Sequence, residues 1–291
     1  MGCLCCHGAA MRLFILTSIV MVAFAANSVL NRLALADGEI GPSAFASIRI
    51  VAGALMLLAL IFFRGGNKLS FSKPNVTAVL ALCAYILGFS HAYISLDAGF
   101  GALLLFGAVQ ITMFIGAFIQ RENLTLQKWI GAALAFSGLI YLLSPSNAGI
   151  DPLGAGLMTI AAIGWGIYSI IGRGAANPLK DTGMNFLYGV PIISLALLLF
   201  PDTTTITASG VLLAVISGAI TSGLGYALWY AIIPQLQTST AAVAQLTVPI
   251  IATAGGIVFL AEAIDSRFII ATTLVLCGVG ISAYRRKPNT P

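Results

Sequence analysis

Charged side chains are scarce in this sequence. Aspartate, glutamate, lysine and arginine make up 8% of its 291 residues, whereas a soluble globular domain carries about 25%. Hydrophobic residues reach 59%, and the mean hydropathy is +1.02. So little charge in so apolar a chain excludes a soluble protein and predicts an integral membrane protein.

The groups that intramembrane chemistry needs are also few. The sequence has two histidines, His7 and His91, and no acidic residue in the middle of an apolar segment. No cluster has metal-ligand spacing, and the phosphate-binding pattern GxxxxGK[ST] is absent. We therefore expect no enzyme, no cofactor and no metal site. Any transport would draw on a solute or ion gradient rather than on ATP.

Paired cysteines and clustered basic residues are lacking as well. The five cysteines show no spacing that indicates a disulfide framework. The net charge of +5 comes from basic residues dispersed among short loops, which argues against a nucleic-acid partner. The lipid bilayer is the expected environment, and the sequence leaves a homodimer open.

Long apolar runs dominate the chain. Ten of them are separated by short connections, which predicts an all-α integral membrane protein whose consecutive helices are mostly antiparallel. We expect each run to be one transmembrane helix, because about 20 apolar residues span the hydrocarbon core. The runs are residues 12–34, 42–63, 75–96, 99–119, 126–143, 152–173, 182–200, 209–233, 238–260 and 266–284.

The basic residues predict the orientation of this bundle. With the N-terminus inside, eleven of the fourteen fall on the cytoplasmic side, two on the outer side, and Arg49 lies within a helix. This bias predicts an inner (cytoplasmic) membrane protein with both termini in the cytoplasm. The cytoplasmic set is Arg12, Arg64, Lys68, Lys73, Arg121, Lys128, Arg173, Lys180, Arg285, Arg286 and Lys287, and the outer pair is Arg32 and Arg267.

The two halves of the chain are weakly similar at an offset of 140 residues. Glu122 then aligns with Glu262, and Gly116 with Gly256. Five helices in each half give the halves opposite orientations, which is the inverted-topology repeat found in many secondary transporters. We expect an N-terminal extension at 1–11, repeats at 12–143 and 152–284, and a basic tail at 285–291, with the native start at either Met1 or Met11. The two glutamates are expected to cap or pair at helix ends.

This organisation resembles the EamA repeat of the drug/metabolite transporter superfamily. The resemblance rests on ten helices in a 5+5 repeat, an Ala-Ala run, and Pro249 followed thirteen residues later by Glu262. Val109 stands where the first copy usually has proline. The stretch from Gly225 to Trp229 is similar to the YddG-type exporters of aromatic amino acids. The resemblance implies a central cavity, with the fifth and tenth helices outside it.

Aromatic and amide side chains in the apolar segments are the candidate substrate contacts. Aromatic faces bind apolar groups or an ammonium, and amides bond a carboxylate or amine without a fixed charge. Each could instead serve helix–helix packing. The predicted substrate-binding set is Asn27, Tyr85, His91, Gln110, Trp165, Tyr168, Tyr226, Trp229, Tyr230 and Gln245, and Pro249 is a predicted kink or gating position.

Two charged or titratable candidates have alternative interpretations. Arg49 either anchors a substrate carboxylate, or it snorkels or pairs with Asp37 or Glu39 near the outer face. His91 either carries a proton, because its charge changes near neutral pH, or makes a neutral hydrogen bond between helices. The inverted repeat favours a secondary transporter that exports aromatic or neutral amino acids or similar amphipathic metabolites. The alternatives are transport of purines, sugars or drugs, and a non-transporting scaffold or receptor.

Overall fold

The computed structural model describes residues 2–64, 74–119, 121, 125–143, 150–199, 201–236, 244–245 and 247–283, with side chains from residue 11 to 282 within these ranges. The described residues form helices, turns and loops, with no strand among them. The helices are α1 (Gly2–Ala36), α2 (Pro42–Phe63), α3 (Val76–Ala92), α4 (Ala98–Ile119), α5 (Leu126–Leu143), α6 (Pro152–Gly172), α7 (Pro178–Leu199), α8 (Ala208–Ile216), η1 (Ser217–Leu224), α9 (Gly225–Ile232), η2 (Ile233–Gln235), α11 (Thr247–Leu260) and α12 (Ser266–Ala283).

These helices agree with the ten apolar segments predicted from the sequence, because α8, η1, α9 and η2 form one continuous span, Ala208–Gln235. Seven described helices are long and apolar enough to cross a membrane, and α3, α11 and α12 are shorter apolar helices. Two differences stand out. α1 already begins at Gly2, so the expected extension continues the first helix, and the expected tail at 285–291 lies outside the described part.

Local sequence explains where several helices begin. Pro42 and Pro152 open α2 and α6, where proline loses no helical hydrogen bond. The side chains of Asn75, Asp151 and Thr207 accept hydrogen bonds from the first backbone N–H groups of α3, α6 and α8. These caps satisfy donors that would otherwise be unpaired at a helix end.

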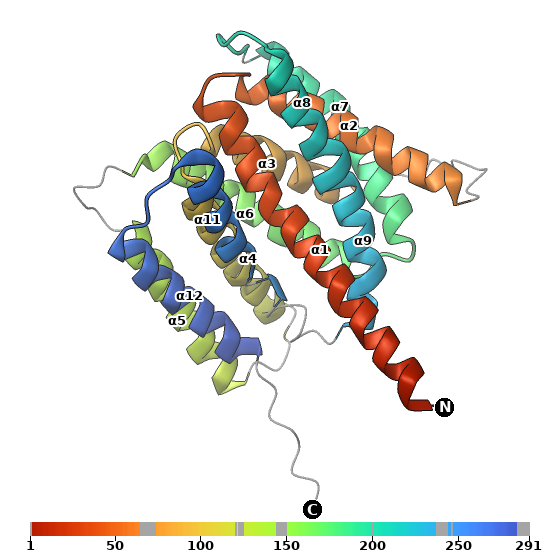
Figure 1. Cartoon of the computed structure of the whole chain (residues 1–291), viewed down its shortest axis with the longest axis vertical. Helices are drawn as coiled ribbons and strands as arrows, with labels where there is room; N and C mark the ends of the chain where they lie inside the picture. Colours follow the sequence, from red (N-terminus) through yellow and green to blue (C-terminus); the bar gives the residue numbers. More distant parts are fainter. Residues whose placement is uncertain are drawn as a thin grey trace, which may run out of the picture.

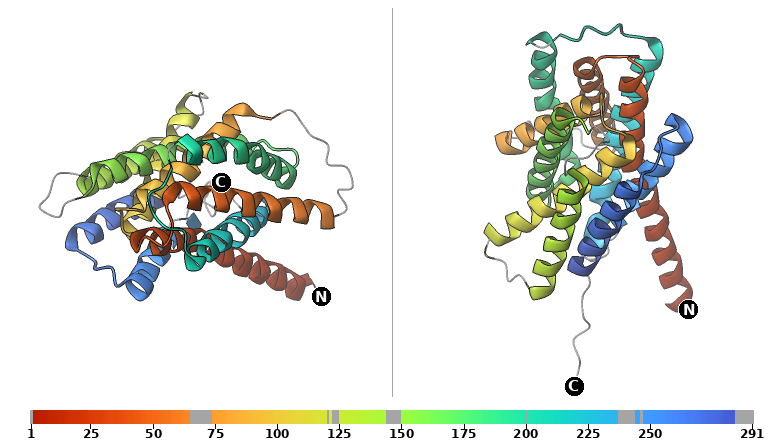
Figure 2. Two further views of the ribbon diagram at one scale, coloured as in Figure 1. Left: turned by 90° about the horizontal axis from the view of Figure 1, so that it is seen from above. Right: turned by 90° about the vertical axis from the view of Figure 1, so that its left-hand side faces the viewer.

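The helices pack with the symmetry expected of an inverted repeat (Figures 1 and 2). α3 packs on α6 and α1 packs on the α8–α9 span, while α2 packs on α7, α4 on α11 and α5 on α12. Each pair maps onto itself or onto another pair when the halves are exchanged. Arg121 and Ala261, which are 140 residues apart, both have positive φ, at 57° and 52°. The backbone therefore repeats the same unusual helix ending in both halves.

The α5–α12 pair lies at one side of the bundle (Figure 1), as the sequence predicted for the fifth and tenth helices. Its helices approach closely at glycines. A Cβ atom on Gly278 would lie 2.5 Å from the backbone nitrogen of Ala135, and one on Gly131 would lie 2.4 Å from the carbonyl oxygen of Gly278. Small residues at such contacts are typical of helix packing in membranes.

The bundle has two faces, which we name here. The terminal face is where α1 begins and α12 ends, and it includes residues 173–177 and 233–236. The distal face is the opposite one and includes residues 37–41, 93–97, 150–151, 201–207 and 261–265.

Candidate functional site

A pocket of about 290 Å³ lies at the terminal face, among α4, α6, α9 and the residues before α11. Five of its lining residues are substrate contacts predicted from the sequence, and they come from both halves of the chain. We call it the terminal pocket. Its lining residues are Gln110, Met113, Trp165, Ser169, Gly172, Arg173, Ala175, Pro178, Trp229, Tyr230, Ile233, Pro234, Leu236 and Gln245.

The walls of the terminal pocket combine aromatic faces with amides. Trp165 and Trp229 supply apolar area, and Gln110 and Gln245 supply hydrogen-bond donors and acceptors without formal charge. Tyr230 can reach the pocket because its neighbour on α6 is Gly172, where a Cβ atom would lie 2.6 Å from the tyrosine hydroxyl oxygen. Such a lining suits a small solute with an apolar part and a few polar groups.

A second pocket of about 350 Å³ adjoins the first and shares Gly172, Ala175, Pro178 and Tyr230 with it. It contains Tyr168, another predicted contact, together with polar residues of α7. The structure therefore brings six of the ten predicted contacts to two connected hollows at the terminal face.

Aromatic side chains close the deep end of the terminal pocket. Trp165 lies 4.9 Å from Tyr226 and 5.0 Å from Tyr85, measured between ring centroids. Phe24 of α1 packs edge-on against Trp165, Tyr226 and Trp229 at 5.8–6.1 Å. We call these five residues the aromatic partition. Edge-to-face packing of this kind is favourable, so the pocket ends here in this conformation.

Beyond the partition, buried polar side chains gather around the π-helix η1. The amide oxygen of Asn27 accepts hydrogen bonds from Ser217 and Thr221. Asn27 thus joins α1 to η1, which corresponds to the helix-contact alternative for this amide. Rare π-helical turns within α-helices often occur at functional sites.

Arg49 lies in the same region and is fully buried. Its Nη2 donates to the hydroxyl of Tyr85 at 2.9 Å and its Nε to the hydroxyl of Ser222 at 3.2 Å. The guanidinium also lies over the rings of Tyr85 and Phe89 at 5.3 and 5.0 Å. Snorkelling and pairing with Asp37 or Glu39, two of the alternatives from the sequence, are therefore not what the structure shows.

Two predicted residues lie away from the terminal pocket. His91 is near the distal face, where one ring nitrogen lies 2.9 Å from the carbonyl oxygen of Leu87 and the other 3.4 Å from the hydroxyl of Ser43. This is the helix-contact arrangement. Pro249 lies near the described start of α11, and residues 244–245 before it are helical as well, so its role as a kink or gating position stays a prediction.

The distal face is closed by polar contacts that join the two halves of the chain. Glu262 accepts from the backbone N–H of Ala98 at the start of α4, at 2.8 and 3.0 Å, and lies 3.7 Å from the Nε of Arg32. This confirms that Glu262 caps and pairs at helix ends. Glu122, its expected counterpart, lies outside the described residues.

Three further carboxylates make contacts that complete this closure. Asp202 accepts from the backbone N–H groups of Ser43 and Ala44 at the start of α2, at 3.2 and 2.7 Å. Glu39 accepts from the hydroxyls of Thr207 and Ser209, and Asp151 from that of Ser95. We call these contacts, with those of Glu262, the distal latch.

The pKa values of Glu262, Glu39 and Asp151 are shifted from their usual values. Burial raises the pKa of Glu262 above its usual value, against the opposing effects of the Ala98 N–H and Arg32. Hydrogen bonds from Ser209 and Thr207 lower the pKa of Glu39. The Ser95 hydroxyl and the Gly154 N–H lower that of Asp151.

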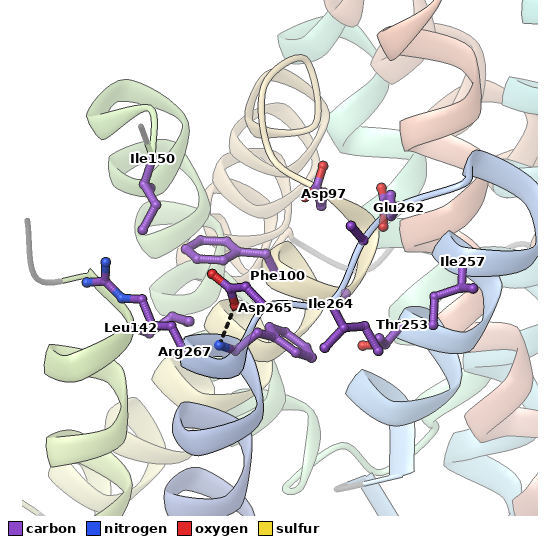
Figure 3. Close-up of a pocket in the computed structure, with 13 residues that line it drawn as sticks. Asp97, Phe100, Leu142, Ile150, Thr253, Ile257, Glu262, Ile264, Asp265 and Arg267 are labelled. Atoms are coloured by element: carbon purple, nitrogen blue, oxygen red, sulfur yellow. Dashed lines mark hydrogen bonds between the residues drawn. The ribbon is translucent and has the colours of Figure 1, made fainter. Parts of the chain in front are cut away.

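A smaller pocket of about 170 Å³ lies beside the latch, between α4, α11 and the α5–α12 pair (Figure 3). Asp97 and Glu262 lie near each other at one end of it, and Asp265 accepts from the backbone N–H of Phe268. Its remaining walls are mostly aliphatic. It lies at the rim of the bundle, apart from the aromatic and amide residues, so it is not the candidate substrate site.

The chain was compared with known proteins. The model of the EamA-like transporter family matches residues 11–144 and, a second time, residues 152–284. The chain belongs to this family. One relative, the uncharacterized protein PA1977 of Pseudomonas aeruginosa, is 40% identical and covers 93% of this chain and 94% of its own.

Two other similar proteins are more distant. A probable amino-acid metabolite efflux pump of Salmonella typhimurium is 26% identical, over 65% of this chain and 68% of its own. A protein of known crystal structure matches with a TM-score of 0.66 at 20% identity, covering 91% of this chain and 95% of its own, which shows the fold alone.

Sequence reasoning missed the small hydroxyl residues Ser217, Thr221 and Ser222. Their pattern offered one signal, since Ser217 and Thr221 are four apart in an apolar segment and so share a helix face. The partners in the distal latch gave no comparable signal, because each contact joins residues far apart in the sequence.

Proposed function

We propose that this EamA protein is a secondary transporter that exports aromatic or neutral amino acids, or similar amphipathic metabolites, across the inner membrane by alternating access. The terminal pocket is the observation that carries the proposal. Its two tryptophans suit an apolar side chain, and Gln110 and Gln245 suit polar groups of the solute. The name of the Salmonella relative supports the same substrate class.

The direction of opening follows from the charges. The described basic residues at the terminal face include Arg12, Arg64, Lys128, Arg173 and Lys180. By the positive-inside rule this face is cytoplasmic, as is the N-terminus. The structure then corresponds to a state open to the cytoplasm and closed outside by the distal latch. An exporter loads its solute in such a state.

The inverted repeat supplies a means of changing state. Exchanging the conformations of the two halves would close the terminal face and open the distal one around the same central residues. The latch contacts would break in that change, because each joins one half to the other.

Counterflow of labelled amino acids in proteoliposomes tests the proposal. Trp229→Ala and Gln245→Ala remove an aromatic wall and an amide, while Trp129→Ala removes an exposed tryptophan on α5 as the control. We expect saturable uptake in the parent and the control, and at least a tenfold weaker apparent affinity in both pocket variants. Parental apparent affinity in both pocket variants would move the site elsewhere. Flux of purines or sugars but of no amino acid would overturn the substrate class and the link to YddG-type exporters.

A further inference from the structure

Arg49 is a buried cation without a carboxylate partner in the described part of the chain. It is fully buried on α2, and its Nη1 has no hydrogen-bond partner. The two ion pairs found among the described residues both belong to Arg32 at the distal face. The charge of Arg49 is therefore stabilised by hydroxyls and aromatic rings rather than by a carboxylate.

Burying a guanidinium without a counter-charge costs free energy. Removing a guanidinium from water costs several kcal/mol, and hydroxyls and ring faces recover part of this. A full counter-charge recovers more, and charged residues inside membrane helices usually mark a solute or ion pathway. The site thus has an unused donor and an unbalanced charge, both of which an anion would satisfy.

The surroundings of Arg49 are organised rather than incidental. The π-helix η1 places the Ser222 hydroxyl on the Nε of Arg49. η1 comes this close to α2 because residue 218 is glycine, where a Cβ atom would lie 2.2 Å from the carbonyl oxygen of Arg49. The Tyr85 hydroxyl accepts a hydrogen bond from Nη2 of Arg49. The Tyr226 hydroxyl in turn lies 3.3 Å from the Tyr85 hydroxyl. Helices from both halves therefore build this position.

Only Tyr85 and Trp165 lie between Arg49 and the terminal pocket. Tyr85 bonds Arg49 on one side and packs against Trp165 on the other, and Trp165 lines the pocket. A solute that enters from the terminal face thus meets the aromatic partition first and the arginine directly behind it.

We propose that Arg49, with the hydroxyls of Tyr85 and Ser222, is a subsite for the carboxylate of the transported solute. The carboxylate occupies it once the partition opens, while the apolar part of the solute stays against Trp165 and Trp229. The inference rests on the proposed function and makes it narrower: the solute is a carboxylate-bearing amphipathic molecule rather than an amine or a neutral metabolite.

The test compares solutes that differ in this one group. Counterflow is measured in proteoliposomes for phenylalanine and for phenylalaninamide, in which an amide replaces the carboxylate. We expect the parent to prefer the acid by at least tenfold in apparent affinity. Arg49→Gln should bring this ratio close to one, mainly by weakening the apparent affinity for the acid, and Arg49→Lys should retain part of the ratio.

A second arginine near the pocket provides a matched comparison for Arg49→Gln. Arg173 lines the exposed mouth of the terminal pocket, and Arg173→Gln should keep the acid-to-amide ratio. Loss of the ratio in Arg173→Gln with retention in Arg49→Gln would overturn the proposal. If Arg49→Gln does not fold, Tyr85→Phe and Ser222→Ala keep the charge but release its two anchors. Each should lower the ratio several-fold, and an unchanged ratio in both would also overturn it.

Two further outcomes separate this inference from the proposed function. Equal, saturable uptake of acid and amide by the parent would leave a transporter and refute the carboxylate subsite. Flux that requires chloride but not the solute carboxylate would assign Arg49 to an inorganic anion and would refute the proposal as well. No saturable flux of any amphipathic solute would refute the transport function on which the proposal rests.

Discussion

Glu262 provides a quantitative test of the distal latch. Both of its carboxylate oxygens face the Ala98 N–H at the start of α4, Arg32 lies nearby, and its side chain is 10% exposed. A hydrogen bond to a charged group contributes about 1.5–3 kcal/mol. Glu262→Ala removes the acceptor of the Ala98 N–H, and relief from burying the carboxylate offsets part of that loss. We therefore expect the closed distal face to lose about 1–2 kcal/mol, or roughly 5- to 30-fold in its equilibrium with an open state.

The assay is thiol labelling of Ala98→Cys from the distal side, with the native cysteines replaced by alanine. Ala98 is fully buried beneath the latch, so it reacts when α4 and α11 separate. Labelling by a membrane-impermeant maleimide should be about 5- to 30-fold faster in Glu262→Ala than with glutamate at this position. Asp265→Asn, on the same loop but outside the latch, should leave the rate unchanged. A folded Glu262→Ala variant with the parental labelling rate would refute the reasoning.

Other predictions concern pH and packing. Because burial raises the pKa of Glu262, the closed face binds a proton more tightly than an open, hydrated one. Acidification from pH 7 through this raised pKa should therefore slow Ala98→Cys labelling relative to the Glu262→Ala variant, which has no group to titrate at this position; a faster relative rate would contradict this sign. Gly278→Leu should separate α5 from α12, because its Cβ atom would meet the backbone of Ala135. The free energy of unfolding should fall by about 1–3 kcal/mol, as measured by thermal unfolding in detergent, while counterflow persists. Ala261→Gly should relieve the strain of a positive φ and raise the free energy of unfolding by about 1 kcal/mol. The melting temperature should rise accordingly, and a lower one would contradict this prediction.

Hydropathy was sufficient to predict most of the fold. The segments at 42–63 and 126–143 coincide with α2 and α5, because the bilayer imposes an apolar stretch of fixed minimum length. The inverted repeat was visible in the offset of 140, and the paired backbone angles of Arg121 and Ala261 agree with it. The π-helix η1 was not predictable, since it arises where Gly218 packs against the backbone of α2.

The candidate site was predicted in kind but not in arrangement. Aromatic residues three and four apart marked one face of α9, and Trp229 and Tyr230 do line the terminal pocket. Which helices would share that pocket depended on packing between halves, so Tyr226 proved to belong to the aromatic partition and does not line the pocket. Arg49 was compared with the acids nearest in sequence, whereas its actual partners, Tyr85 and Ser222, are brought to it by α3 and η1.

Reciprocal accessibility of the two faces tests alternating access most directly. Ser169 lines the terminal pocket and Ala98 lies beneath the distal latch, so cysteines at these positions report the two openings separately. The account predicts that Glu262→Ala speeds labelling at residue 98 and slows it at residue 169, because one equilibrium governs both. Faster labelling at residue 98 with no decrease at residue 169 would mean that the faces open independently, and this would contradict the central claim.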